Sequence, residues 1–172
     1  MLFRSYRIVS DSLSSNTARN REYTQIILNK YPVETIVGLY RNRGFDEGTI
    51  RSMACLQHIF RQQYSCALEY AREPWADTDG LDQAFYLGTL ALQTGDLQTA
   101  MAELGNHLER FPDSPAGLNN MGIVQRRMSQ EATEWFMRAL KVFPRYQDAY
   151  NNLENPESQA ITLSQLAAGR IR

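Results

Sequence analysis

The sequence predicts an all-α protein built as an array of antiparallel helix pairs, and two observations carry this prediction. First, Gly117–Gly122 (GLNNMG) recurs as Ala149–Glu154 (AYNNLE) after 32 residues, and Phe111-Pro112 recurs as Phe143-Pro144 at the same spacing. Second, apolar and small residues in 81–94 recur at intervals of three and four, which is the period of a buried helix face. A shared offset together with a helical period indicates a repeated helical unit.

The first well-marked pair of helices is predicted over 81–114. One face of its first helix carries Ala84, Leu87, Gly88 and Ala91. Gly95-Asp96 ends that helix, and Asp96 is placed to cap the second, which Pro112 stops. Gly88 and Ala100 are small because paired helices have to cross closely at these positions. We therefore expect a tight helical hairpin.

The second pair is predicted over 115–146, with Ser114 as the N-cap and Pro115 in the first turn. The turn between its helices is contracted to Met128–Gln130. A further unit begins near Tyr150 and continues to 154. The sequence thus predicts repeat units over 81–154.

The flanking segments are less regular. Residues 1–15 form an N-terminal segment, and 16–80 are predicted as divergent helical hairpins with helices over 16–30, 33–42, about 48–61 and 64–71. The whole chain, 1–172, is predicted as one helical-repeat domain.

The last segment, 155–172, is predicted as a capping helix. Asn155-Pro156-Glu157 is a favourable helix start, and one helical face of 156–171 carries Ala160, Leu163, Ala167 and Ile171. A terminal repeat needs a cover, which favours a cap. The alternative is a helix that enters the groove of the array and regulates it.

Composition and motifs argue against several classes of function. A net charge of −1 lacks the basic footprint of a nucleic-acid binder. No window has the roughly 18 apolar residues of a membrane span, and no apolar signal region follows the early arginines, so we expect a cytoplasmic chain without membrane insertion. Phosphate loops, HExxH, CxxC and nucleophile elbows are all missing from the sequence. No catalytic activity and no cofactor are predicted.

Metal binding is the remaining chemical alternative. Cys55 and His58 share a helical face and Cys66 follows, but only the distant His107 could be a fourth zinc ligand. Small thiols in a helical core are usually structural. We predict no metal site, with a zinc-dependent enzyme as a remote alternative.

The two predicted helix pairs resemble repeats of the tetratricopeptide repeat (TPR) family. Residues of 81–114 follow its loose pattern at Ala84, Leu87-Gly88, Ala91, Ala100, Leu104 and Pro112. Residues of 115–146 follow it at Leu118, Met121-Gly122, Gln125, Ala132, Phe136, Ala139 and Pro144. The resemblance covers about half of the chain. It implies a superhelical array whose concave groove binds a peptide or a partner helix.

The register of this resemblance places ten residues in the predicted peptide-binding groove: Phe85, Tyr86, Thr89, Asn119, Asn120, Ile123, Arg126, Arg127, Asn151 and Asn152. Asn120 and Asn152 occupy equivalent places in successive units. A carboxamide has a donor and an acceptor, so each could pair with the backbone N–H and C=O of an extended peptide. The arginines would bind carboxylates, and Phe85 and Tyr86 would anchor apolar groups. Alternatively, the asparagines merely suit an exposed helix surface.

A secondary partner surface is predicted around Trp75, Asp77 and Asp79, because residues 62–114 hold nine acids and two bases. The alternative is a tryptophan packed under a loop. We therefore expect a non-catalytic scaffold or adaptor that binds protein or peptide, with homo- or hetero-oligomers through the terminal repeats left open. A dedicated assembly or secretion chaperone for one client subunit is the alternative function.

Overall fold

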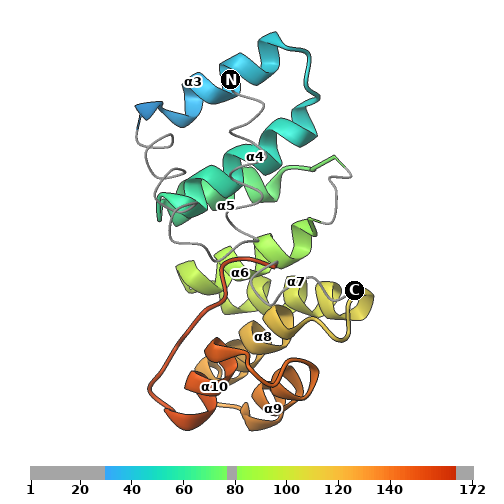
Figure 1. Ribbon diagram of the computed structural model, residues 1–172, viewed down its shortest axis with the longest axis vertical. Helices are drawn as coiled ribbons and strands as arrows, with labels where there is room; N and C mark the ends of the chain where they lie inside the picture. The colour runs from blue at the N-terminus through green and yellow to red at the C-terminus, as the bar shows by residue number, and fades with distance from the viewer. Residues whose placement is uncertain (1–29, 77–80, 166–172) are drawn as a thin grey trace. The chain divides into compact units, whose positions relative to one another are not determined.

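The computed structural model describes residues 30–76 and 81–165 of the chain. In these residues all regular secondary structure is helical, and no strand is present (Figure 1). The helices are α3 (Val33–Asn42), α4 (Glu47–Phe60), α5 (Tyr64–Arg72), α6 (Gln83–Thr94), α7 (Leu97–Arg110), α8 (Pro115–Arg127), α9 (Thr133–Val142) and α10 (Gln147–Glu154). These eight helices pack in sequence as adjacent pairs, which confirms the all-α class. None of them is long and apolar enough to cross a membrane.

The chain divides into two compact units, Met1–Gly80 and Leu81–Arg172. In the first unit, α3 packs on α4 through a core of Ile36, Tyr40, Ile50 and Met53, and α4 packs on α5. The helix predicted over 33–42 is α3, and those predicted over about 48–61 and 64–71 are α4 and α5. The helix predicted over 16–30 and the segment 1–15 lie outside the described residues, apart from Lys30.

In the second unit, α6 pairs with α7 and α8 pairs with α9, and α10 packs on α9. The first helices α6, α8 and α10 begin at Gln83, Pro115 and Gln147, so their starts repeat every 32 residues, as the sequence predicted. Helix α8 also contacts both α6 and α10. The first helices therefore form one continuous side of this unit.

The predicted caps and turns of the second unit are confirmed. Asp96 accepts a hydrogen bond from the backbone N–H of Thr99 (3.1 Å), and Ser114 accepts from the N–H of Gly117 (3.2 Å). Gly95 ends α6 with φ at 90°, in the left-handed region that glycine favours. In the contracted turn after α8, Ser129 takes that role with φ at 59°.

Close helix crossings also occur where small residues were predicted. A Cβ on Gly88 would lie 2.9 Å from both the backbone N and the Cγ of Leu104 on α7. Ala100 is fully buried in the same hairpin. A larger side chain at either position would push α6 and α7 apart.

The predicted capping helix is wrong over its described part, 155–165. This segment contains no helix, and it runs from the end of α10 back along the first helices to the start of α6 (Figure 1). At its far end the side-chain carbonyl of Gln165 accepts from the N–H of Asp82 (2.9 Å). The physical reason is that the backbone groups of Ala160 and Thr162 pair with asparagine side chains instead of with their own helical turn. Residues 166–172 lie outside the described part.

Candidate functional site

Three asparagines of the second unit form what we call the asparagine site: Asn119 and Asn120 of α8, and Asn152 of α10. All three side chains are fully buried, although asparagine usually lies at the surface. Buried amides need hydrogen-bond partners, and here the segment 155–165 supplies most of them.

Asn120 and Asn152 bind the backbone of this segment in the same way. The side-chain oxygen of Asn152 accepts from the N–H of Ala160 (2.8 Å), and its Nδ2 donates to the carbonyl of the same residue (3.1 Å). Asn120 accepts from the N–H of Thr162 (2.8 Å) and donates to its carbonyl (2.9 Å). Two asparagines in equivalent positions, 32 residues apart, thus bind Ala160 and Thr162, which are separated by one residue in the segment. This is the backbone pairing that the sequence predicted for a bound peptide, made here by the chain itself.

Asn119 links the two pairs. Its Nδ2 donates to the carbonyl of Ala160 (2.9 Å), and its Oδ1 accepts from Asn152 (2.9 Å). Asn120 donates a further bond to the hydroxyl of Thr89 on α6 (2.9 Å). The amide orientations are therefore fixed by their partners on α6, α8 and α10.

The two predicted arginines also contact the segment, but through neutral oxygens. Nη1 of Arg126 donates to the carbonyls of Pro156 and Ser158 (3.0 Å each). The guanidinium of Arg127 binds the side-chain carbonyl of Gln159, with Nε at 2.8 Å, and Nη1 donates to the carbonyl of Leu92 (2.6 Å). Partial burial lowers the pKa of Arg127 below its ordinary value. The predicted binding of carboxylates by these arginines stays a prediction.

The other predicted groove residues fall into two groups. Phe85, Tyr86 and Ile123 are fully buried within the unit, so their predicted contact with a partner stays a prediction. Asn151 is exposed and accepts from Gln147 of its own helix (2.7 Å), so it lies apart from the asparagine site.

The predicted secondary surface is only partly described. Trp75 is half-buried in the first unit, and its indole N–H donates to the carbonyl of Tyr70 (3.0 Å). Asp77 and Asp79 lie outside the described residues. The acidic surface therefore stays a prediction.

A buried Asp–His–Ser arrangement, which sequence reasoning missed, joins three helix ends of the second unit. Nδ1 of His107 lies 2.5 Å from Oδ2 of Asp82, and Nε2 lies 2.8 Å from the Ser114 hydroxyl. Asp82 also caps α6, and Ser114 caps α8. A Cβ on Gly117 would lie 2.7 Å from the imidazole, so α8 packs directly against the ring. We assign this network to holding the helix ends together.

The network predicts a pH dependence of stability. Burial by itself would raise the pKa of Asp82, but the hydrogen bond and charge of His107 and the charge of Arg110 outweigh it and hold that pKa below its usual range. Its contribution to stability is thus complete above the ordinary pKa of about 4, and it is lost as the pH falls through the lower folded value. We expect Asp82→Asn to lower the free energy of unfolding by about 1–2 kcal/mol at pH 7, and by less near pH 3, in urea titrations. The exposed Asp113→Asn is the control, and a difference that stays constant with pH would contradict the assignment.

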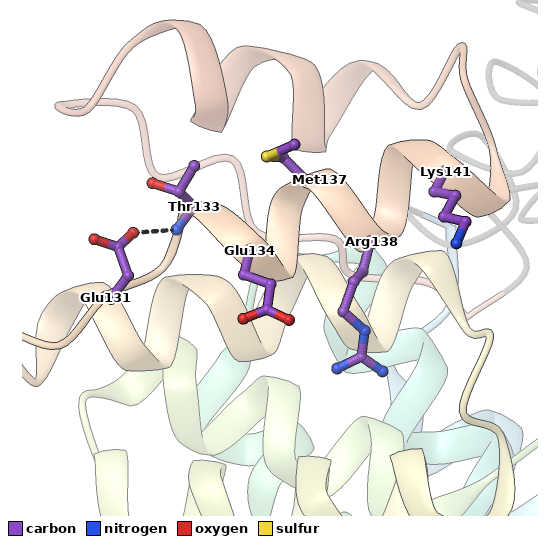
Figure 2. Close-up of a pocket in the computed structure, with 6 residues that line it drawn as sticks. All are labelled: Glu131, Thr133, Glu134, Met137, Arg138 and Lys141. Carbon is purple, nitrogen blue, oxygen red and sulfur yellow. Dashed lines mark hydrogen bonds between the residues drawn. The ribbon is translucent and has the colours of Figure 1, made fainter.

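A shallow pocket lies on α9 and the turn before it (Figure 2). It is lined by Glu131, Thr133, Glu134, Met137, Arg138 and Lys141. Its two acidic and two basic side chains have opposite charges, and none of its lining residues is one of the buried residues of this helix, Phe136 and Ala139. The pocket shares no residue with the asparagine site.

The residues considered for zinc do not form a cluster. Cys55 is buried, which raises the pKa of its thiol, whereas Cys66 is exposed. His58 hydrogen-bonds Gln63 (2.9 Å). Within residues 30–76 and 81–165 no group of three His, Cys, Asp or Glu side chains is placed to hold a metal ion.

Comparison with known proteins found no relative of this chain. Set against models of protein families, curated proteins and solved structures, the chain matches none of them.

Proposed function

We propose that this protein is a TPR-like, non-catalytic interaction module that binds a partner protein through an extended peptide. The peptide lies across the first helices α6, α8 and α10. The proposal rests on one observation above all: Asn120 and Asn152 each pair with both backbone groups of a residue in a non-helical segment. A surface that already holds one such segment by its main chain can hold another.

Main-chain recognition has a physical consequence. Every residue except proline offers the same N–H and C=O, so these pairs favour an extended conformation without selecting a side chain. The asparagines are ordered by their neighbours before any partner arrives, which lowers the entropy cost of binding. The three helices therefore supply a prepared surface for an extended chain.

Testing the proposal requires a chain in which the segment 155–165 has left the asparagine site. We define the opened variant as the full chain with Ala160→Pro and Thr162→Pro. Proline lacks the N–H that donates to each asparagine, so each backbone pair loses this bond while every helix residue is kept.

A library of random linear peptides selected on the opened variant then tests the function. We expect the selected peptides to bind at least about tenfold more weakly when Asn120→Ala and Asn152→Ala are added, because buried backbone groups lose their partners. The control is Asn151→Ala, on the exposed side of α10, which should leave binding unchanged. Peptides that keep full affinity for the double asparagine variant, with its helical circular dichroism intact, would place the binding site elsewhere.

A further inference from the structure

One side chain of the segment 155–165 is bound as specifically as its backbone. Thr162 is only 2% exposed, and its hydroxyl donates to the carboxylate of Asp148 (2.7 Å). Because the single hydroxyl hydrogen is used there, the oxygen accepts from the Tyr146 hydroxyl and from Nδ2 of Asn119 (3.2 Å). All the hydrogen-bonding capacity of the threonine is therefore satisfied by three groups of α8, α10 and the N-cap of α10.

We call these three groups the hydroxyl subsite. Its polar groups need a bound hydroxyl as their hydrogen-bond partner. Tyr146 is only 4% exposed, and its burial raises the pKa of the phenol, so it stays a neutral donor. A valine in place of the threonine has the same shape, but it would leave the Tyr146 hydroxyl and the Asp148 carboxylate facing a methyl group. A site of this kind discriminates strongly against a ligand that lacks the hydroxyl.

The backbone two residues before the threonine is also held. The N–H of Ala160 donates to Asn152, and its carbonyl accepts from Asn152 and Asn119. Between these positions Ile161 is half-exposed, and Thr162 and Ser164 are the buried residues of 160–165, two apart as in an extended strand. Side-chain selection in 160–162 therefore rests on the buried hydroxyl position, which takes threonine or serine.

We infer that the partner of this protein presents a Thr or Ser side chain in a segment that is bound by its main chain, and that the chain's own 160–162 occupies the site as an intramolecular competitor. This inference rests on the proposed function, because it assigns the ligand class and the regulation of the same site. Five residues, 155–159, connect α10 to the occupied position. A tether this short holds the segment at an effective concentration on the order of millimolar, so a partner has to displace it.

The test uses two synthetic peptides and the full chain. The Thr peptide has the sequence of residues 155–165, and the Val peptide is the same peptide with the Thr162→Val change. We expect the Thr peptide to bind the opened variant at least about tenfold more tightly than it binds the wild-type chain, whose own segment competes. We expect the Val peptide to bind the opened variant at least about tenfold more weakly than the Thr peptide. Fluorescence anisotropy of labelled peptides measures both.

The outcomes separate this inference from the proposed function. Equal binding of both peptides, lost in each case with Asn120→Ala, would overturn the hydroxyl subsite and leave the peptide-binding function standing. No binding of either peptide to a folded opened variant would overturn both. Equal affinity of the Thr peptide for the wild-type and opened chains would overturn the intramolecular competition.

A second measurement covers an opened variant that fails to fold. Thr162→Val in the otherwise unchanged chain should reduce hydrogen-exchange protection of the backbone amides at positions 160 and 162 by at least about tenfold. The control Ile161→Val installs the same residue one position away, where the side chain is half-exposed, and should leave that protection unchanged. Equal protection in the two variants would overturn the hydroxyl subsite.

Discussion

Phe136→Ala is expected to lower the free energy of unfolding of the second unit by about 3–5 kcal/mol, the largest effect of any substitution considered. The Phe136 ring is fully buried between α9 and α8. The guanidinium of Arg126 lies over its face at 4.7 Å, and Gly122 lies against its edge. Truncation removes the buried ring and leaves a cavity that two packed helices close only in part. Urea unfolding followed by circular dichroism measures the loss.

A double-mutant cycle with Gly122 makes this result specific to the α8–α9 crossing. A Cβ on Gly122 would lie 2.6 Å from Cε1 of Phe136, so Gly122→Ala should destabilise the wild-type chain by about 1–3 kcal/mol. In the Phe136→Ala chain the cavity accepts the new methyl group. Alanine is then favoured over glycine in a helix by about 1 kcal/mol, so the sign of the effect reverses.

Gly105 provides the matched control for this cycle. It lies in α7, and a Cβ there would meet no atom within 4 Å outside its own helix turn. Gly105→Ala should therefore stabilise both the wild-type and the Phe136→Ala chains by about the same amount. A Gly122→Ala effect of the same sign in both backgrounds would show that the ring does not limit the approach of the two helices.

The helix pairs of the second unit could be predicted because their signals are local. Asp96 and Ser114 cap helices within three residues of their own positions, and Gly95 ends a helix by its own backbone conformation. The 32-residue spacing then predicted where the first helix of each following unit begins, up to α10. Signals of this kind need no knowledge of distant residues.

The segment after α10 shows where local signals fail. Ala160 and Leu163 share a helical face, and this periodicity predicted a helix. The bonds from Asn120 and Asn152 to residues 160 and 162 span up to 42 residues of sequence, and they replace the bonds that a helix would make. The same asparagines were predicted to bind an extended peptide, and the alternative for 155–172 was a helix that enters the groove. The described part of this segment does lie on the asparagines, but it is not a helix.

The Asp82–His107–Ser114 network was missed for a related reason. Asp82 and His107 are 25 residues apart, and each has an unremarkable neighbourhood in sequence. A signal was nevertheless present, since Ser114 was predicted as a cap. A histidine near the end of the preceding helix is well placed to reach such a cap, because the helix pair folds back on itself.

Asn120→Asp should have the second-largest effect, because it exchanges one side-chain atom at the centre of the asparagine site. The Nδ2 group of Asn120 donates to the Thr162 carbonyl (2.9 Å) and to the Thr89 hydroxyl (2.9 Å). An ionised aspartate would place a negative oxygen against the Thr162 carbonyl in a fully buried position. We expect a cost of at least about 3 kcal/mol at pH 7, which is roughly a hundredfold in an equilibrium constant.

Release of the segment 155–165 relieves this repulsion, because the Thr162 carbonyl can only accept a hydrogen bond, whereas the Thr89 hydroxyl on α6 can rotate and donate to the new carboxylate. Hydrogen-exchange protection of the Ala160 and Thr162 amides should therefore fall by about a hundredfold at pH 7, while the protection of α6 and α8 persists. Asn151→Asp adds the same charge one residue before Asn152 on the exposed side of α10, and it should leave the two amides protected. Equal loss in both variants would mean that charge alone, and not the pairing with Thr162, controls the segment.

Lowering the pH should restore the segment in Asn120→Asp. Burial and the facing carbonyl raise the pKa of the new carboxyl group in the closed state above its ordinary value of about 4. The penalty is therefore complete above that raised pKa, and it disappears as the pH falls towards the ordinary value, where the protonated carboxyl can donate to the Thr162 carbonyl. Protection that stays low at every pH would show that the amide hydrogens of Asn120 act through Thr89 on α6 and not through the bound segment. Recovery at acid pH would make occupation of the site by the segment 155–165 a titratable property of this variant.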